Sequence, residues 1–217
     1  MFKAFLLLWL GHLLGDFVLQ NSKIARGKSE HFSWLFLHSM IIWICSACLI
    51  IPAWTLHNLL IISGLAGIHF GIDMIKLCFQ KKSFSKTFGY FILDQVLHVL
   101  SILFISPFLS VAPSYLPQSV AFLAITALMN TYFLDIFLYV FRSKRKPMVY
   151  SRDWMGYAFR GPSFFIWVWN GYAGGTVLLI GALVQFRLTQ SLKGVGRQYG
   201  LCFVFNLCFF WIWRLIF

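Results

Sequence analysis

Charged residues are scarce in this sequence, and acidic ones most of all. Only 11% of the 217 residues carry a formal charge, with six acidic side chains against 18 lysines and arginines. A soluble domain is usually about one quarter charged, and a disordered chain is more hydrophilic still, so both classes are excluded. The sequence also has no G-x-S-x-G motif, phosphate-binding loop or dinucleotide glycine fingerprint, which argues against a serine hydrolase and the common nucleotide-binding folds.

Long apolar runs are what the sequence has instead. Hydrophobic residues make up 60% of the chain and aromatic residues 19%. A helix needs about 20 apolar residues to cross the hydrocarbon core of a bilayer, and seven stretches meet this requirement. The sequence therefore predicts an all-α, polytopic transmembrane helical bundle that forms a single integral membrane domain over residues 1–217. The predicted spans are 2–20, 33–54, 57–79, 88–111, 118–141, 161–186 and 199–217.

The lysines and arginines lie mainly in three connections between these spans. Because cytoplasmic loops are enriched in lysine and arginine, we expect the first, third and fifth connections to be cytoplasmic. The N-terminus would then lie outside, with the chain in a bacterial inner (plasma) membrane. The net charge of +12 fits a protein whose basic residues set its orientation in the membrane and attract anionic lipid headgroups. We therefore expect membrane lipids as partners and no binding of nucleic acid. This orientation leaves an outer excess of Arg187, Lys193 and Arg197 unexplained, and the glycine-rich sixth span is compatible with a bend or a re-entrant turn.

Histidines and carboxylates are concentrated inside the predicted spans, where they are costly. A charged group in the bilayer normally faces the interior of the bundle and needs a partner. Three His/Asp pairs are spaced four residues apart, which places both members on one face of a helix. The pairs are His12 with Asp16, His69 with Asp73, and Asp94 with His98.

These pairs and His38 share a depth. With the orientation above, all of them lie roughly 6–15 Å below the inner surface, at a rise of about 1.5 Å per residue. One common site is the simplest explanation. Imidazole and carboxylate groups are ligands of zinc, manganese and non-haem iron, and a divalent ion would offset the repulsion between buried carboxylates. We therefore predict a divalent metal ion, zinc or manganese, bound by His12, Asp16, His69, Asp73, Asp94 and His98.

Two further residues receive catalytic roles. His38 is expected to be an additional ligand or an acid/base group. Lys76 continues the His69–Asp73 stripe and could hold a phosphate at the cytoplasmic edge of the site, although a lysine that extends to the membrane surface is the alternative. Asp135 has poorer spacing relative to its polar neighbour Asn130, and its membership of the site stays open.

The order of these motifs resembles a known bacterial membrane family, the domain of unknown function 3307. The resemblance rests on His12-Leu-Leu-Gly-Asp16-Phe-Val-Leu-Gln20, His38, His69-Phe-Gly-Ile-Asp73-Met-Ile-Lys76 and Leu93-Asp94-Gln95-Val-Leu-His98, and it covers roughly the first half of the chain. The family brings no established activity. The His-x-x-x-Asp helices are more loosely similar to those of integral membrane proteins described as metal-dependent hydrolases, including phospholipase-like ones.

Three functions are compatible with this pattern. The favoured hypothesis is a metal-dependent membrane hydrolase that acts on a lipid or lipid-linked phosphoester near the cytoplasmic leaflet. The same polar layer could instead serve a proton- or metal-ion-coupled transporter, since intramembrane His and Asp residues commonly form such relays. It could also lock the helices of a non-enzymatic membrane subunit or sensor together.

Overall fold

The regular elements of the protein are helices throughout the described part of the chain, which confirms the all-α prediction. The computed structural model describes residues 1–79, 87–111, 116–143, 150 and 152–217. The chain divides into two compact units, Met1–Ala121 and Phe122–Phe217. We call them unit 1 and unit 2 and describe each by itself.

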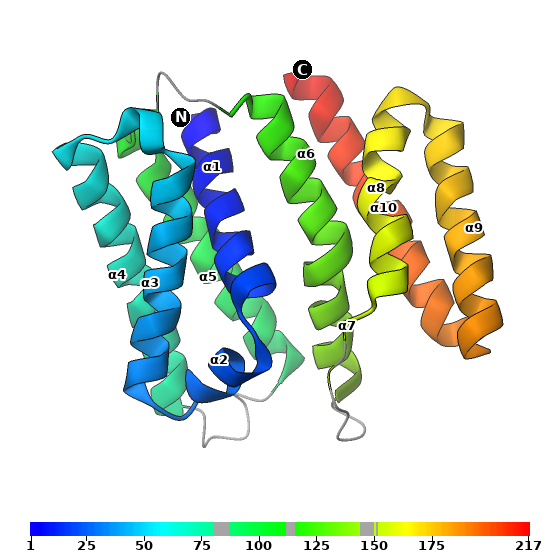
Figure 1. The fold of residues 1–217 in the computed structure, drawn as a ribbon, viewed down its shortest axis with the longest axis horizontal. Coiled ribbons are helices and arrows are strands. Elements are labelled where there is room, and N and C mark those ends of the chain that lie inside the picture. The colour runs from blue at the N-terminus through cyan, green and yellow to red at the C-terminus, as the bar shows by residue number, and fades with distance from the viewer. Residues whose placement is uncertain (80–86, 112–115, 144–149, 151) are drawn as a thin grey trace. The chain divides into compact units, whose positions relative to one another are not determined.

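Unit 1 places four long helices next to one another, with a short helix after the first (Figure 1). The first helix ends in a π-helical turn, η1, and two 3₁₀ turns that contain prolines follow the second and fourth long helices. The elements are α1 (Phe2–Leu13), η1 (Leu14–Leu19), α2 (Ser22–Gly27), α3 (Phe32–Leu49), η2 (Ile51–Ala53), α4 (Leu56–Phe79), α5 (Phe88–Ile105) and η4 (Ser106–Phe108).

Polar side chains fix the ends of these helices. Asn21 caps α2 because its side-chain oxygen accepts hydrogen bonds from the backbone N–H groups of Lys23 and Ile24, both at 2.9 Å. At the opposite end of the unit, the side chain of Asn58 donates to the carbonyls of Ala53 and Ser110 at 2.7 and 2.6 Å. Asn58 therefore ties the turn between α3 and α4 to the segment that follows α5.

Unit 2 is also built from helices. Its first helix is interrupted by a second π-helical turn, and three more helices follow. Leu134, Trp167, Leu178, Tyr199 and Cys202 form its apolar core together with Leu138 and Val195. The elements are α6 (Gln118–Leu128, which begins just before the unit boundary), η5 (Met129–Phe133), α7 (Leu134–Ser143), α8 (Trp154–Trp169), α9 (Gly171–Thr189) and α10 (Leu192–Ile216).

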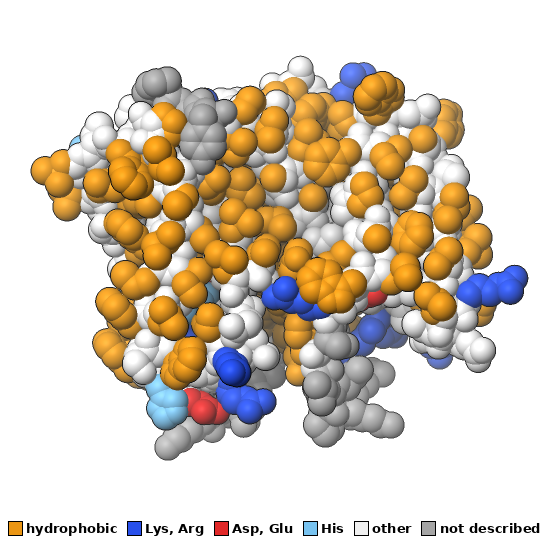
Figure 2. Space-filling model, viewed as in Figure 1, with side chains coloured by type: hydrophobic (Ala, Val, Ile, Leu, Met, Phe, Trp, Pro, Cys, Tyr) orange, Lys and Arg blue, Asp and Glu red, His pale blue; other side chains and the backbone are white. Residues whose placement is uncertain are grey.

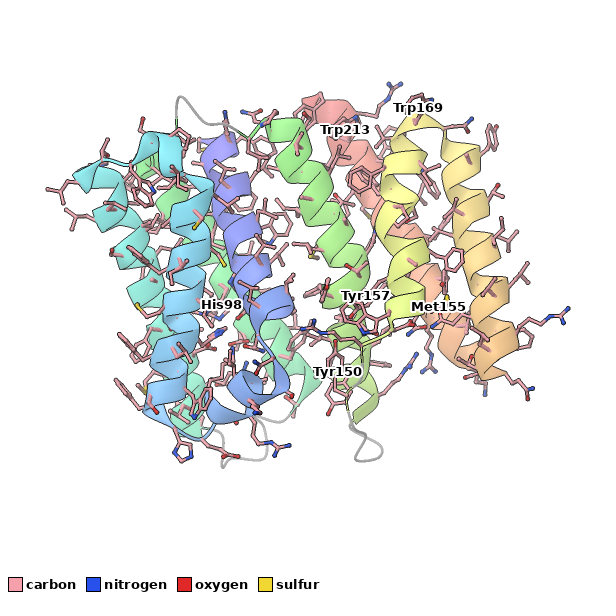
Figure 3. The ribbon with its side chains drawn as sticks, viewed as in Figure 1. His98, Tyr150, Met155, Tyr157, Trp169 and Trp213 are labelled. Carbon is pink, nitrogen blue, oxygen red and sulfur yellow. The ribbon has the colours of Figure 1, made fainter. Side chains whose placement is uncertain are left out.

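Seven helical segments within the described residues are long and apolar enough to cross a membrane, which agrees with the predicted number. Large apolar side chains are exposed on them, and Figure 2 shows hydrophobic side chains covering most of the face in view. Trp169 (Figure 3) and Tyr172 are each 93% exposed where α8 meets α9, the position of an interfacial aromatic anchor. These features identify an integral membrane protein.

The predicted sixth span, 161–186, is wrong as one continuous helix. It covers the second half of α8 and most of α9, and the chain reverses between them at Asn170. The backbone of Asn170 is extended, and its side chain accepts hydrogen bonds from the N–H groups of Tyr172 and Ala173 at 3.1 and 3.2 Å. An N-cap of this kind starts a new helix, so the local chemistry at Asn170 overrides the apolar run.

The α8–α9 pair packs with little space between backbones. A Cβ atom on Gly174 would lie 2.7 Å from the Cα atom of Trp167, whereas one on Gly175 would have nothing within 4 Å. Gly174→Ala should therefore lower the stability of the protein by about 1–3 kcal/mol because backbone atoms must shift. Gly175→Ala should be neutral or stabilising by up to about 1 kcal/mol through its helix propensity. Thermal unfolding of both variants in detergent measures the difference, and equal midpoints would contradict the observed α8–α9 packing.

Candidate functional site

The His and Asp residues predicted to share a site come together in the interior of unit 1. They arise from α1 with η1, α3, α4 and α5, and each is buried. Figure 3 shows His98 inside the helices of this unit. We call this group the His/Asp cluster; its members are His12, Asp16, His38, His69, Asp73, Asp94 and His98.

The first helix reaches the cluster through its π-helical turn. The Nε2 atom of His12 lies 3.5 Å from Oδ2 of Asp16, which stands within η1. Single π-helical turns are frequent at functional sites because they reposition side chains along a helix. Gly15 allows a close approach to α3, since a Cβ there would lie 2.5 Å from Cγ1 of Ile42. The small residue thus lets Asp16 reach side chains of α3.

His38 on α3 connects the two central carboxylates. Its Nε2 atom lies 2.8 Å from Oδ1 of Asp16 and 3.5 Å from Oδ2 of Asp73. The same nitrogen lies 3.3 Å from Nε2 of His69. His38 itself is fully buried, so these groups meet away from solvent.

Helices α4 and α5 complete the cluster. Asp73 lies between two imidazoles, with 3.5 Å from its Oδ2 to Nε2 of His69 and 3.8 Å from its Oδ1 to Nε2 of His98. The rings of His69 and His98 are stacked, with centroids 4.1 Å apart. Asp94 contacts His98 at 3.6 Å. The i,i+4 pairs therefore do more than share a helix face, because they also contact pairs on neighbouring helices.

The sequence did not predict the role of Lys28. Its Nζ atom lies 3.2 Å from Oδ2 of Asp73, 3.6 Å from Oδ1 of Asp16 and 2.9 Å from Nε2 of His38. Lys28 follows α2 in a short connection, where a lysine was read only as an orientation signal. The one hint available from the sequence was the need of buried carboxylates for a nearby cation.

The carboxylates set the protonation of Lys28. Burial alone would lower the pKa of its ammonium, but the Coulombic attraction of Asp73, and then of Asp16, raises that pKa above its ordinary value of 10.5. A raised pKa in the folded state means that the ammonium stabilises the fold fully below pH 10.5. This contribution is lost only as the pH rises through the higher, folded-state pKa. Lys28 is therefore a fixed positive charge at neutral pH.

The contacts of His38 Nε2 cannot all be hydrogen bonds at once. If this nitrogen carries a proton, it donates to Asp16 but faces Lys28, whose ammonium offers only donors. If it carries none, it accepts from Lys28, and two acceptors remain 2.8 Å apart, namely Nε2 and Oδ1 of Asp16. A metal ion is able to accept electron pairs from several such atoms at once, so it could bind His38 Nε2 together with the neighbouring acceptors.

Within the described part of the chain, two sets of three ligand atoms could hold such an ion, with the atoms of each set within 4.8 Å of one another. Neighbouring ligand atoms around a tetrahedral zinc ion are about 3.3 Å apart for bonds of about 2.0–2.1 Å. The His38–His69 distance of 3.3 Å and the His69–Asp73 distance of 3.5 Å are close to that value. Because both sets use the single lone pair of His69 Nε2, they are alternatives. The first set consists of Asp16, His38 and His69. The second consists of His69, Asp73 and His98.

The remaining predicted residues lie around these sets. His12 and Asp94 belong to neither set, although the His12 ring lies 5.1 Å from the ring of His98. Lys76 pairs with Asp94 at 2.7 Å, and its side chain is 35% exposed, which places it at the edge of the cluster. The Nδ1 atoms of His38 and His98 are buried without a hydrogen-bond partner among the described residues, so they lack the protein acceptor that commonly orients a ligating histidine.

Two charged residues of unit 2 have partners within that unit. Asp135 has its own partners, since its Oδ2 accepts hydrogen bonds from Tyr157 at 2.9 Å, from Tyr150 at 3.4 Å and from the backbone of Asp153 at 3.3 Å. Arg160 is fully buried in α8. Its guanidinium pairs with Asp153 at 3.1 Å, which explains how a charge is accommodated there.

One protein family matches the chain over residues 4–136, and its description reads "Protein of unknown function (DUF3307)". The matched segment contains every member of the His/Asp cluster as well as Lys28 and Lys76. No curated protein and no solved structure matches the chain.

The position of Lys28 gives a direct prediction. Lys28→Met leaves Asp16 and Asp73 without their cation, and breaking a buried ion pair in this way typically costs about 3–5 kcal/mol. We expect a lower free energy of unfolding for this variant in metal-free detergent solution. Lys23→Met, which changes an exposed lysine of the short helix α2 just before Lys28, should unfold like the parent protein. If the two variants had equal stability, the central role of Lys28 would be refuted.

Proposed function

The chain belongs to the family of domain of unknown function 3307, and we propose for it the function that its own His/Asp cluster supports best. The protein is a metal-dependent integral membrane hydrolase. Its substrate is the phosphoester of a lipid or a lipid-linked molecule. One observation carries the proposal, namely that four imidazoles and three carboxylates from four membrane helices meet in one buried cluster.

The donor set supports a divalent ion. Nitrogen and oxygen donors with no nearby thiolate suit zinc or manganese among the common metals. The set of His69, Asp73 and His98 supplies three ligands, which leaves a further coordination position for water or substrate. A divalent ion held by these residues would activate water as a nucleophile and polarise the ester.

The residues outside this ligand set have roles in the same proposal. Asp16 and His38, whose side chains are 2.8 Å apart, form an acid/base pair beside it, with the carboxylate orienting the imidazole. Lys76, at the exposed edge, binds the phosphate of the substrate. His12 supports the ligands from α1 through its ring contacts with His69 and His98.

The charge distribution supports a cytoplasmic position for the cluster in a bacterial inner membrane. If α8 crosses the bilayer in addition to the seven segments, the chain returns to the same side. All lysines and arginines then fall there except Lys3, Arg214 and Arg160, which is buried within α8. The contact of 3.2 Å between the Arg142 guanidinium and the carbonyl of Gly194 supports this arrangement, because it joins the end of α7 to the start of α10. Arg187, Lys193 and Arg197 then cease to be an outer excess.

Metal analysis tests the proposal most directly. The purified protein should contain about one equivalent of zinc or manganese, and a chelator should lower its unfolding temperature, because a bound ion adds its binding free energy to the folded state. His69→Ala should abolish binding, because His69 belongs to both ligand sets. His31→Ala, which removes an exposed histidine, should keep the metal. A metal-free protein whose stability does not change with chelation would refute the proposal.

Lys76 separates substrate binding from metal binding. Lys76→Met should raise the KM for a phospholipid or polyprenyl phosphate substrate by about tenfold, the effect of losing one charge-assisted contact, while leaving the metal content unchanged. Hydrolysis of phosphatidic acid or polyprenyl phosphate in mixed micelles, measured by phosphate release, gives the KM, and elemental analysis gives the metal content. An unchanged KM would remove Lys76 from the substrate site.

A second function is favoured by Lys28 alone. This ammonium already compensates Asp16 and Asp73, and a buried chain of Lys, Asp and His is typical of a proton relay. Proteoliposomes distinguish the two functions. Proton or metal-ion uptake that depends on Asp73 and occurs without ester hydrolysis would favour transport over catalysis.

A further inference from the structure

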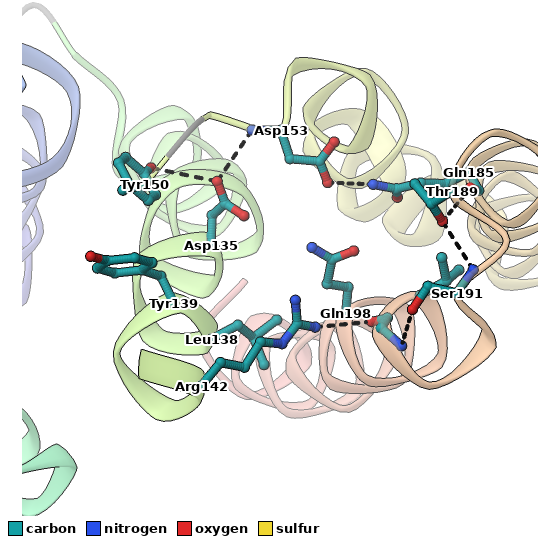
Figure 4. Close-up of a pocket in the computed structure, with 12 residues that line it drawn as sticks. Asp135, Leu138, Tyr139, Arg142, Tyr150, Asp153, Gln185, Thr189, Ser191 and Gln198 are labelled. Atoms are coloured by element: carbon teal, nitrogen blue, oxygen red, sulfur yellow. Dashed lines mark hydrogen bonds between the residues drawn. The ribbon is translucent and has the colours of Figure 1, made fainter. Parts of the chain in front are cut away.

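Unit 2 contains a polar pocket of about 240 Å³ that uses no residue of the His/Asp cluster. It is lined by one face of α7, by Tyr150 and Asp153 just before α8, by the end of α9 and by the start of α10 (Figure 4). Pockets for drug-sized ligands are usually larger than about 300 Å³, so this one suits a smaller polar molecule. The family match ends at residue 136, so most of the pocket lies beyond it.

Two opposite charges on one helix face define the ends of the pocket. Asp135 and Arg142 are seven residues apart on α7, which places them on the same face about 10.5 Å apart along the axis. Both line the pocket. Among the described residues, Asp135 forms no ion pair with a lysine or arginine, and Arg142 forms none with a carboxylate. The carboxylate of Asp153 also lines the pocket, but it is paired with Arg160 at 3.1 Å. Asp135 and Arg142 therefore remain as one negative and one positive charge in the pocket without an ion-pair partner among the described residues.

The end at Asp135 is suited to an ammonium group. The carboxylate is held in place by the hydroxyls of Tyr150 and Tyr157. Tyr139 and Tyr150, whose rings lie 5.3 Å apart, form an aromatic wall beside it. Carboxylates and aromatic faces together bind alkylammonium groups, the first by charge and the second by cation–π attraction.

The end at Arg142 is suited to an anion. The guanidinium donates one hydrogen bond to the carbonyl of Gly194 and keeps further N–H groups available. It stands beside the start of α10, a helix of 25 residues capped by Ser191. The N-terminus of such a helix carries a partial positive charge, which adds to that of Arg142.

One buried amide oxygen between the two ends lacks a partner among the described residues. This atom is Oε1 of Gln185, while Nε2 of the same side chain donates to Asp153 at 2.6 Å. The side chain of Gln198, a residue that is 9% exposed, also lines the pocket. Buried polar atoms without partners are uncommon in native proteins, and a polar ligand in the pocket would satisfy this one.

We infer that this pocket binds a small zwitterion, with its ammonium group at Asp135 and its anionic group near Arg142. A simple anion would leave Asp135 as a repelling charge, and a simple cation would do the same with Arg142. The chemistry fits both the phosphoethanolamine headgroup of a membrane lipid and a free zwitterion such as an amino acid.

Binding of soluble probes to the full-length protein in detergent tests the inference. Ethanolamine phosphate should bind at least about tenfold more tightly than inorganic phosphate or ethanolamine alone, because each of these lacks one charge-assisted contact. Isothermal titration calorimetry gives the three affinities without any variant. If neither ethanolamine phosphate nor an amino acid such as glycine binds better than its single-charge comparators, the inference is overturned.

Matched variants assign the binding to the two ends. Asp135→Asn keeps the shape of the side chain and its tyrosine hydrogen bonds, and should weaken binding of ethanolamine phosphate by about tenfold through loss of its charge. Arg142→Gln should have a similar effect. Arg187→Gln makes the same change at an exposed arginine of α9 outside the pocket and should bind like the parent. If Asp135→Asn left the affinity for ethanolamine phosphate unchanged, the pocket would be a simple anion site, and the inference of a zwitterionic ligand would be wrong.

Competition separates the two sources of the ligand. Phosphatidylethanolamine in the micelle, but not phosphatidylglycerol, should displace ethanolamine phosphate if the ligand is a lipid headgroup. Displacement by free amino acids, with no effect of phosphatidylethanolamine, would assign the site to a soluble zwitterion. Either result supports the inference, whereas equal displacement by phosphatidylglycerol would contradict it.

Discussion

Compensation of two buried carboxylates is the constraint on which unit 1 depends. Asp16 and Asp73 stand inside apolar helices, where an unpaired charge is too costly to keep. Lys28 lies within 3.6 Å of both, and imidazoles from four different helices approach them. Because each helix supplies part of this compensation, separating any one of them exposes a buried charge. The cluster therefore fixes the packing of the unit as well as its chemistry.

The same compensation makes the site chemically versatile. The buried groups are held so closely that His38 Nε2 has more neighbours than its single position can satisfy by hydrogen bonding. Either an ammonium group or a divalent metal ion could neutralise the buried carboxylates. Within the chain itself, Lys28 supplies that positive charge.

Unit 2 handles burial of polar groups differently. Arg160 is neutralised inside the unit by Asp153, and Gln185 donates to the same carboxylate. Asn130 on η5, Asn206 on α10 and Ser163 on α8 form a neutral hydrogen-bonded chain. Such networks hold membrane helices together without unpaired charge. The family match ends near the start of this unit, at residue 136, so its polar pocket is a feature of the later part of the chain.

The sequence by itself determined the helical class, the membrane location and the pairing of His and Asp along each helix. These follow from composition and from the helical repeat, which are local properties. Only the tertiary structure decided that the pairs of four helices touch, that Lys28 enters among them from a short connection, and that the chain reverses at Asn170. Contacts between distant segments depend on how helices pack, and a lysine in a connection or an asparagine within an apolar run carries no periodic signal of such a contact.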